Sequence, residues 1–176
     1  MTRDELAKAI YEVSHLEGNF TLRSGQTSHE YFDKYLFESQ PNILKVIAKH
    51  MAKKVPAGTE ILAGLEMGGI PIATAISIET GIPVVFVRKK AKKYGTCKLA
   101  EGTDFKNKKV CIIEDVVTTG GQILISAEDL KTFGAELANV ICVIERNPEG
   151  REKLTEAGLE LISLFTMEEL KKHGRQ

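Results

Sequence analysis

The stretch from Val110 to Gln122 reads VCIIEDVVTTGGQ and decides the fold of this chain. Its first four residues form a continuous apolar run, which is typical of a strand buried on both faces of a parallel sheet. Two adjacent carboxylates, Glu114 and Asp115, are expected to end that strand. The turn TTGG follows, and apolar residues then return from 123 to 133 at a spacing near 3.6, which predicts a helix. The order is therefore strand, acidic pair, glycine-rich turn and helix.

A glycine-rich turn that leads into a helix is suited to bind a phosphate group. Its backbone N–H groups have no partners within the helix and point outward, with the positive end of the helix dipole behind them. Thr118 and Thr119 add hydroxyl donors, and glycine lets the backbone come close to a ligand. Glu114 and Asp115 need a different partner, either sugar hydroxyls or a hard cation such as Mg²⁺. The stretch predicts a site for a phosphorylated sugar; the alternative is a strand-end turn with exposed acids.

Composition and charge argue against several classes of protein. The chain has 24 Lys and Arg against 24 Asp and Glu, so no overall field draws it to nucleic acid or to an anionic membrane. No apolar run approaches the length of a membrane span, and the first ten residues carry two acids where a signal peptide has its apolar segment. Three cysteines without a CxxC pair and four scattered histidines argue against disulfides and zinc. We expect a cytoplasmic protein that binds neither nucleic acid nor membrane.

Strands and helices alternate along most of the chain, which indicates an α/β fold with a mainly parallel central sheet flanked by helices. Ligands of such a sheet bind at the carboxyl ends of its strands. The segment 88–108 holds no predicted element, and a loop of that length is usually functional or mobile. Strands are predicted at 61–63, 84–87, 110–113, 138–144 and 160–164, and helices at 70–80, 123–133, 148–157 and 167–173.

The chain is expected to form one domain over residues 1–176. Residues 1–40 are expected to form a helix and a small flap outside the main sheet, and residues 41–176 the α/β core. The elements predicted before the core sheet are a helix over 4–16 with Thr2 as its cap and Gly18 as its stop, a short strand over 20–26, an extended aromatic segment over 31–37 and a helix over 43–55.

Two further stretches are suited to bind anions. Residues 64–71 read GLEMGGIP, a second glycine-rich turn between a predicted strand and a predicted helix, whose free N–H groups suit a second anion. The alternative is that its glycines only shape a tight turn.

Residues 88–98 read RKKAKKYGTCK and hold six basic residues among eleven. Such a run is most often a solvated face, but beside two anion turns it is suited to clamp a diphosphate and to exclude water.

Arg146 and Arg23 are candidates to bind a carboxylate of the substrate. Arg146 follows a predicted buried strand, so it projects at the carboxyl end of the sheet, and its planar guanidinium matches a carboxylate. The alternative for Arg146 is an ion pair with Glu145 or a helix cap. Arg23 lies next to a Ser-Gly turn and carries the same ambiguity.

Over essentially its full length the chain resembles the orotate phosphoribosyltransferase family of type I phosphoribosyltransferases. VCIIEDVVTTGG resembles that family's binding motif for 5-phosphoribosyl 1-diphosphate (PRPP), and GLEMGGIP resembles its diphosphate turn. FTLRSGQTSHEYFD resembles its orotate flap, VRKKAKKYGT its catalytic loop, and VIERNPEG the segment with its base-contacting arginine. The resemblance implies Mg²⁺-dependent transfer of ribose 5-phosphate from PRPP to orotate in pyrimidine biosynthesis. It also implies a homodimer in which Lys92 serves the site of the neighbouring subunit.

The resemblance assigns roles to individual residues. Catalysis is expected of Lys92, Glu114 and Asp115, and the two acids would hold the ribose hydroxyls directly or through Mg²⁺. The residues expected to bind PRPP are Arg88, Lys89, Lys92, Tyr94, Glu114, Asp115, Val116, Val117, Thr118, Thr119, Gly120, Gly121 and Gln122. The residues of the diphosphate turn are Glu66, Met67, Gly68 and Gly69. The residues expected to bind orotate are Arg23, Tyr31, Phe32, Thr118 and Arg146.

Four positions depart from the family pattern. Tyr94 stands where many members have histidine, and Gly68 where some have a diphosphate-binding lysine. Gln122 replaces the usual Ser or Thr, which leaves only its backbone amide for phosphate. Arg23 stands where some relatives have lysine.

Two other functions stay open from the sequence. A purine phosphoribosyltransferase would share the ribose phosphate site, but it would not need Arg146 and Arg23 to meet a substrate carboxylate. A non-catalytic regulator that senses PRPP and binds nucleic acid should show a basic face or an added helix-turn-helix.

Overall fold

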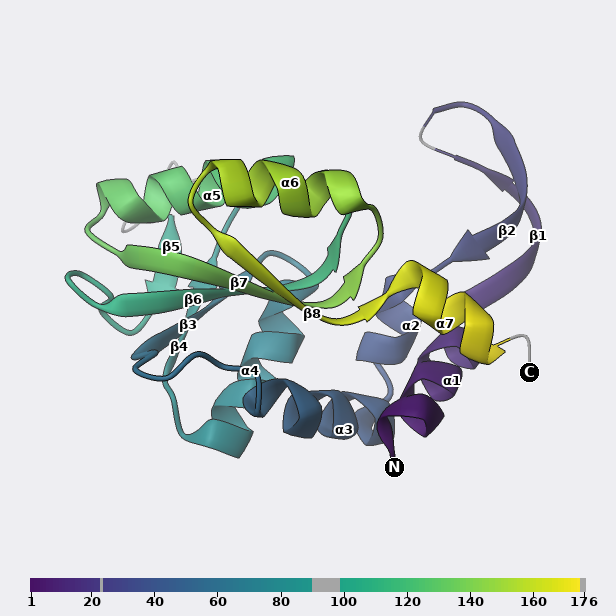
Figure 1. The fold of residues 1–176 in the computed structure, drawn as a ribbon, viewed down its shortest axis with the longest axis horizontal. Helices are drawn as coiled ribbons and strands as arrows, with labels where there is room; N and C mark the ends of the chain where they lie inside the picture. Colours follow the sequence, from purple (N-terminus) through teal and green to yellow (C-terminus); the bar gives the residue numbers. More distant parts are fainter. Residues whose placement is uncertain (23, 90–98, 175–176) are drawn as a thin grey trace.

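The computed structural model describes residues 1–22, 24–89 and 99–174, and its centre is a six-stranded sheet (Figure 1). The elements of the core are β3 (Ile61–Leu65), α4 (Gly69–Thr80), β4 (Val84–Val87), β5 (Ala100–Gly102), β6 (Lys109–Val117), α5 (Gly121–Thr132), β7 (Glu136–Glu145), α6 (Pro148–Glu156) and β8 (Glu160–Thr166). The strand order is β5-β4-β3-β6-β7-β8, and every pairing is parallel except that of β4 with β5. The predicted mainly parallel sheet is confirmed.

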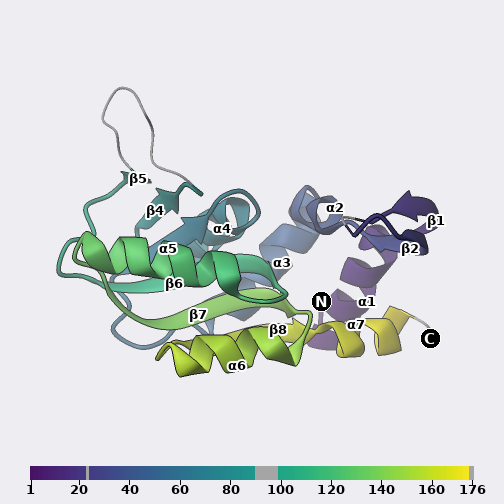
Figure 2. The ribbon, with the colours of Figure 1, turned by 90° about the horizontal axis from the view of Figure 1, so that it is seen from above.

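Helices cover both faces of this sheet (Figures 1 and 2). Helices α5 and α6 lie over one face, and α4 lies over the other together with α3 (Pro41–Ala52). Strand β6 buries side chains toward both: Cys111 and Ile113 join the core on the side of α3 and α4, whereas Val110 and Ile112 join the core under α5 and α6. Burial on both faces is the reason why this strand has no polar alternation in its first half.

Strand β6 is longer than predicted, and the acidic pair does not end it. Its parallel pairing with β7 continues past the pair, with Val116 opposite Ile144 and Val117 opposite Glu145. Glu114 and Asp115 therefore lie inside a paired strand, where their positions are fixed by backbone hydrogen bonds.

The short edge strand β5 falls in the segment for which no element was predicted, because three residues reading AEG carry no periodic apolar signal.

The first 40 residues form a helix, a two-stranded ribbon and a second, short helix. The prediction of a strand over 20–26 is wrong beyond Thr21, where the first strand of the ribbon ends. Thr2 caps helix α1 (Arg3–Ser14) in a capping box with Glu5, which confirms the predicted cap. Gly18 does not stop this helix, because α1 ends at Ser14 and Gly18 lies within strand β1 (His15–Thr21). Strand β1 pairs with β2 (Thr27–Phe32) in an antiparallel ribbon that is separate from the main sheet and projects away from it (Figures 1 and 2).

The prediction that residues 31–37 are extended is wrong beyond Phe32. Asp33 ends the strand and caps helix α2 (Lys34–Glu38), where its side chain accepts a hydrogen bond of 3.0 Å from the backbone N–H of Tyr35. Phe37, on this helix, is fully buried in the core with α1 and α3. The aromatic residues that suggested a strand thus include the buried face of a short helix.

The two ends of the described chain pack together. Helix α7 (Met167–Gly174) lies beside α1 (Figure 1), and the Arg3 guanidinium donates hydrogen bonds to the carbonyl of Leu164 (2.8 Å) and to Glu169 (2.7 Å). Within the described residues, none of the helices combines the length and apolar character that crossing a bilayer requires.

Cys111 and Cys142 are buried free thiols on β6 and β7. Burial raises the pKa of the Cys111 thiol to about 12 and also raises the pKa of Cys142. We expect iodoacetamide at pH 8 to leave both unlabelled in the folded protein and to alkylate both in urea, because the thiolate is the nucleophile. Peptide mass mapping checks this, and native labelling at either position would contradict the packing of these strands. Cys97 lies outside the described residues.

Candidate active site

Two adjoining cavities lie at the carboxyl ends of the central strands. The loop cavity, of about 320 Å³, is lined by Lys34, Tyr35, Glu66, Met67, Lys89, Glu114, Val116, Val117, Thr118, Thr119, Gly120, Gly121, Gln122 and Ile123. The aromatic cavity, of about 160 Å³, is lined by Tyr31, Phe32, Asp33, Lys34, Tyr35, Val116, Thr118 and Arg146. The two cavities have Lys34, Tyr35, Val116 and Thr118 in common.

The loop cavity is built from two strand-to-helix turns. Strand β6 runs through Thr118–Gly120 into α5, and β3 runs through Glu66–Gly68 into α4. Because β3 and β6 are parallel neighbours, both turns emerge at the same edge of the sheet. Gly120 has a φ of +71°, a conformation that glycine adopts without strain. The two predicted anion turns thus face one cavity.

Close packing explains the two glycines of the second turn. Gly68 and Gly69 are both buried. A side chain at Gly68 would collide with the carboxylate of Asp115, and one at Gly69 would collide with the backbone carbonyl of Ile113. The glycines therefore do more than allow a bend, because they let the turn lie directly on strand β6.

Asp115 is the centre of a buried charge cluster beneath this turn. It is fully buried, and its Oδ2 lies 2.5 Å from Nζ of Lys34. Burial raises the pKa of Glu38 to about 9, with the nearby Asp115 adding to the effect. Burial also opposes ionisation of Asp115, but hydrogen bonds from Glu114, Lys34 and Glu38 hold the pKa of Asp115 below its usual range. The cluster therefore places the Lys34 ammonium group against the buried Asp115, with Glu38 close to both.

The two carboxylates of the acidic pair have different surroundings. Glu114 is partly exposed and lines the loop cavity, whereas Asp115 is closed off from it by Lys34 and Gly68. Burial raises the pKa of Glu114 well above its usual range, and Asp115 raises it further. Of the two acids, Glu114 is the one that a ligand in the cavity can reach.

The donors on the loop cavity fit a Mg²⁺ ion that arrives with a phosphorylated substrate. Glu66 and Glu114 both line this cavity. Among the described residues, no group of three or more His, Cys, Asp or Glu is placed to hold a metal without other ligands. Mg²⁺ commonly takes one or two protein carboxylates and completes its shell with water and substrate phosphates. Glu66 and Glu114 match that pattern.

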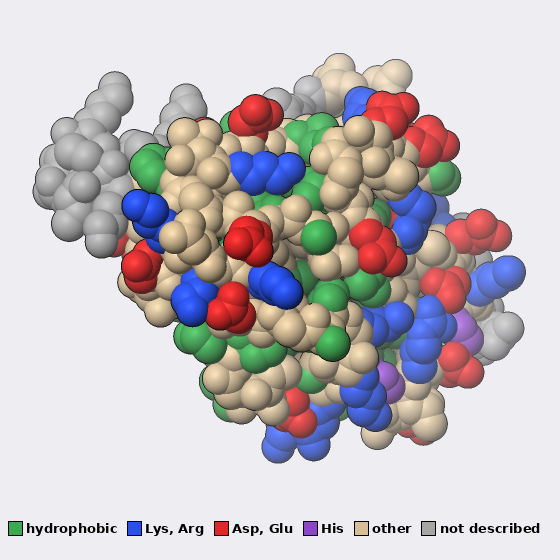
Figure 3. Space-filling model, turned by 60° about the vertical axis from the view of Figure 1, so that its left-hand side comes forward, with side chains coloured by type: hydrophobic (Ala, Val, Ile, Leu, Met, Phe, Trp, Pro, Cys, Tyr) green, Lys and Arg blue, Asp and Glu red, His purple; other side chains and the backbone are tan. Residues whose placement is uncertain are grey.

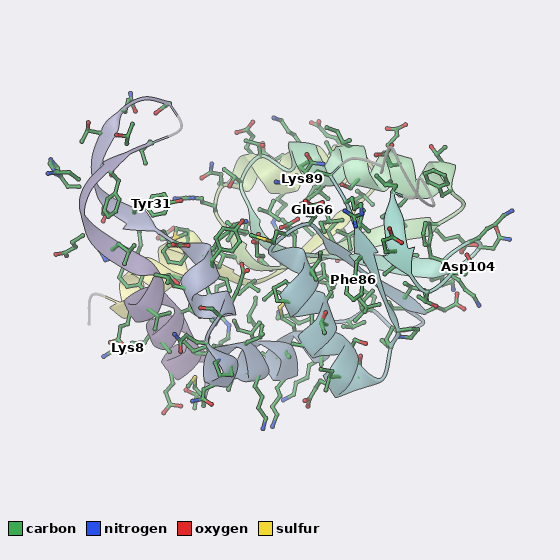
Figure 4. The ribbon with its side chains drawn as sticks, turned by 180° about the vertical axis from the view of Figure 1, so that it is seen from behind. Lys8, Tyr31, Glu66, Phe86, Lys89 and Asp104 are labelled. Carbon is green, nitrogen blue, oxygen red and sulfur yellow. The ribbon has the colours of Figure 1, made fainter. Side chains whose placement is uncertain are left out.

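Of the predicted diphosphate cations, Lys89 is on the loop cavity. Its backbone N–H donates a 3.1 Å hydrogen bond to Glu66, and Figure 4 shows the two side by side above α4. The guanidinium of Arg88 instead lies 3.8 Å from the carboxylate of Glu101 on β5. Lys92 and Tyr94 lie outside the described residues, so their roles stay predictions.

The aromatic cavity brings together four of the residues predicted to bind orotate: Tyr31, Phe32, Thr118 and Arg146. Glu145 is not the partner of Arg146, because Arg151 donates to both oxygens of the Glu145 carboxylate, at 2.8 and 2.5 Å. Arg146 is thereby left to face the cavity. The fifth residue, Arg23, lies outside the described residues.

Helix α2 supplies site residues that the sequence reasoning missed. Lys34 and Tyr35 line both cavities, and Glu38 lies against Asp115. The available signal was Asp33, a favoured N-cap residue, followed by five residues without Gly or Pro. The aromatic content of this segment outweighed that signal.

Comparison with known proteins identifies the family. Residues 37–162 match the model of the phosphoribosyl transferase domain. The orotate phosphoribosyltransferase of Nocardioides sp. is 52% identical to this chain over 171 residues, which are 97% of this chain and 96% of that relative. The chain belongs to the orotate phosphoribosyltransferase family. The predicted family and enzyme class are thus confirmed.

A solved orotate phosphoribosyltransferase has the same fold. The crystal structure of the Mycobacterium tuberculosis enzyme with Fe(III) dicitrate matches with a TM-score of 0.87 at 29% identity, covering 96% of this chain and 98% of that one. The structure of that enzyme in complex with PRPP matches with a TM-score of 0.82 at 27% identity and the same coverage. These matches confirm the predicted fold class.

Proposed function

We propose that the protein transfers ribose 5-phosphate from PRPP to N1 of orotate, giving orotidine 5′-monophosphate and diphosphate. The observation that carries this proposal is the wall that the two cavities share. The loop cavity offers turn N–H groups for phosphates, and the aromatic cavity offers flat side chains and the Arg146 guanidinium for an anionic base. A sugar bound in the first and a base bound in the second meet at Val116 and Thr118.

In the proposed reaction the bond from C1 of the ribose to N1 of orotate forms as the bond from C1 to the diphosphate oxygen breaks. The proton on N1 of orotate passes to an oxygen of the departing diphosphate as the new bond forms, so no protein side chain has to act as a strong general base. Positive charge develops on the sugar and negative charge on the diphosphate. Lys89 and the turn N–H groups stabilise the negative charge on the diphosphate. When bound with PRPP, Mg²⁺ adds positive charge at the leaving group. Glu114 holds the ribose hydroxyls, and catalysis is mainly electrostatics and positioning.

The proposal includes Mg²⁺ as the cofactor and one domain over residues 1–176. A homodimer in the cytoplasm, with Lys92 shared between subunits, is part of it as well. These points are supported by the family membership and by the oxygen donors on the loop cavity.

The direct test is a spectrophotometric assay of orotate loss with PRPP and Mg²⁺ between pH 7 and 9. We expect activity that disappears when Mg²⁺ is removed with EDTA. The same protein is offered a panel of purines, and transfer to a purine but not to orotate would reject the proposed base. Inactive but folded protein that shifts DNA in a gel would favour a regulator. On the face shown in Figure 3, basic and acidic side chains are interspersed, which does not favour nucleic-acid binding.

Lys92→Ala is expected to lower kcat about 100-fold while changing the dissociation constant of PRPP less than fivefold, since a loop cation that acts on the leaving group stabilises the transition state more than the ground state. Steady-state kinetics and PRPP binding by calorimetry check this. An equal loss in turnover and affinity would contradict the transition-state role of Lys92.

A further inference from the structure

We propose that Lys34 is a positioning residue of this reaction and acts through Asp115. The inference rests on the proposed function. Nζ of Lys34 lies 2.5 Å from the Asp115 carboxylate, and the lysine lines both cavities. Of the other cations on these two cavities, Lys89 lines only the loop cavity, and Arg146 lines the aromatic cavity but not the loop cavity. Lys34 is therefore the cation placed where sugar and base meet.

The ion pair between Lys34 and Asp115 holds the Gly68 turn, which borders the loop cavity, in position. Asp115 is fully buried, and an ionised carboxylate in that position needs a cation and hydrogen bonds. It also fills the space over Gly68, so that the turn and the carboxylate hold each other in place. Without the lysine, the buried carboxylate of Asp115 has no cation and moves toward water. That movement releases the turn that carries Glu66 and Met67.

The same ion pair joins the base-binding part of the chain to the sugar-binding part. Lys34 begins α2, two residues after Phe32 of the aromatic cavity. Asp115 lies on β6 between Glu114 and Val116, which line the loop cavity. Loss of the ion pair lets α2 shift relative to β6, and with them the base relative to the sugar. A misplacement of the reacting groups by about 1 Å can cost roughly 100-fold in rate.

Glu38 supports this arrangement from the same helix. It lies one turn after Lys34 and is buried over Gly68, beside the carboxylate of Asp115. Helix α2 therefore contacts Asp115 through two side chains at i and i+4 spacing. Lys34 carries the positive charge in this pair of contacts, and Glu38 packs beside the buried acid.

The test compares Lys34→Met with Lys34→Arg and with the control Lys8→Met. Lys8 is exposed on α1, away from the site (Figure 4). We expect Lys34→Met to lower kcat about 100-fold and to raise the KM for PRPP less than fivefold, since positioning acts mainly on the reacting complex. Lys34→Arg, which keeps a cation for Asp115, should stay within about tenfold of the wild type, and Lys8→Met should be unchanged.

Lys34→Gln covers the case in which the methionine variant does not fold. Its amide can still donate a hydrogen bond to Asp115, and we expect a kcat loss of about tenfold or more in folded protein. Rates are corrected for the folded fraction measured by circular dichroism. Values of kcat and KM within twofold of the wild type, for either variant, would overturn the inference. A wild type that does not consume orotate would instead reject the proposed function, and the inference would fall with it.

Discussion

Arg146→Ala raises the KM for orotate about 100-fold, if Arg146 binds the substrate carboxylate as proposed. A charge-assisted hydrogen bond contributes about 1.5–3 kcal/mol, and a planar guanidinium can make two of them to one carboxylate. Arg146 does not pair with Glu145, because Arg151 donates hydrogen bonds to both oxygens of that carboxylate. Since Arg146 lines the aromatic cavity and not the loop cavity, the KM for PRPP should change less than threefold.

Arg151→Ala is the matched control for that prediction. It also removes one arginine from the segment after β7, but Arg151 holds the buried Glu145 and donates to the carbonyl of Leu161 at 2.6 Å. We expect a loss of about 2 kcal/mol in the free energy of unfolding, because a buried carboxylate loses its cation. The KM for orotate should stay close to the wild-type value. Steady-state kinetics with urea denaturation separate the two variants, and an equal rise in KM for both would contradict the assignment of Arg146.

Gly69→Ala is expected to destabilise the protein by about 3 kcal/mol and to lower kcat/KM for PRPP more than 100-fold. The added methyl group would meet the carbonyl oxygen of Ile113, which belongs to the backbone of the central strand and cannot rotate away. Either α4 or β6 must move. The residue after Ile113 is Glu114, so the shift reaches the wall of the loop cavity directly.

Gly121→Ala provides the comparison for stability. A methyl group there has Thr119 Oγ1 at 3.9 Å as its nearest neighbour, and alanine is the better helix former at the start of α5. Its free energy of unfolding should be within about 0.5 kcal/mol of the wild type, or higher. Urea denaturation of the two variants checks the contrast. Equal stability of the Gly69→Ala and Gly121→Ala variants would contradict the close contact between Gly69 and the carbonyl of Ile113.

Much of the core could be predicted because its signals are local. The apolar run from Val110 to Ile113 and the turn that follows it specify a buried strand, an anion loop and a helix within a few neighbouring residues. The same holds for the second glycine turn. Parallel strands then bring both turns to one edge of the sheet, which is a general property of this fold class. The loop cavity follows from these features with little further information.

Helix α2 and the length of β6 were not predictable in the same way. The aromatic residues from Tyr31 to Phe37 suit a strand by propensity, and only burial of Phe37 against α1 and α3 shows why the chain turns into a helix after Asp33. The acidic residues of β6 suggest a strand end, yet pairing with β7 carries the strand on to Val117. In both segments tertiary contacts outweighed local preference.

By itself the sequence determined the family, the order of the core elements other than β5, and the residues of the two anion turns, since each depends on residues close together in the chain. The tertiary structure alone decided the pairing of the charges. Asp115 meets Lys34 from a distant helix, and Glu145 meets Arg151 and leaves Arg146 to the cavity. An arginine or a lysine can pair with many acids in principle. Burial and close approach in the folded chain select the partner, and the spacing of the residues in the sequence predicts neither of them.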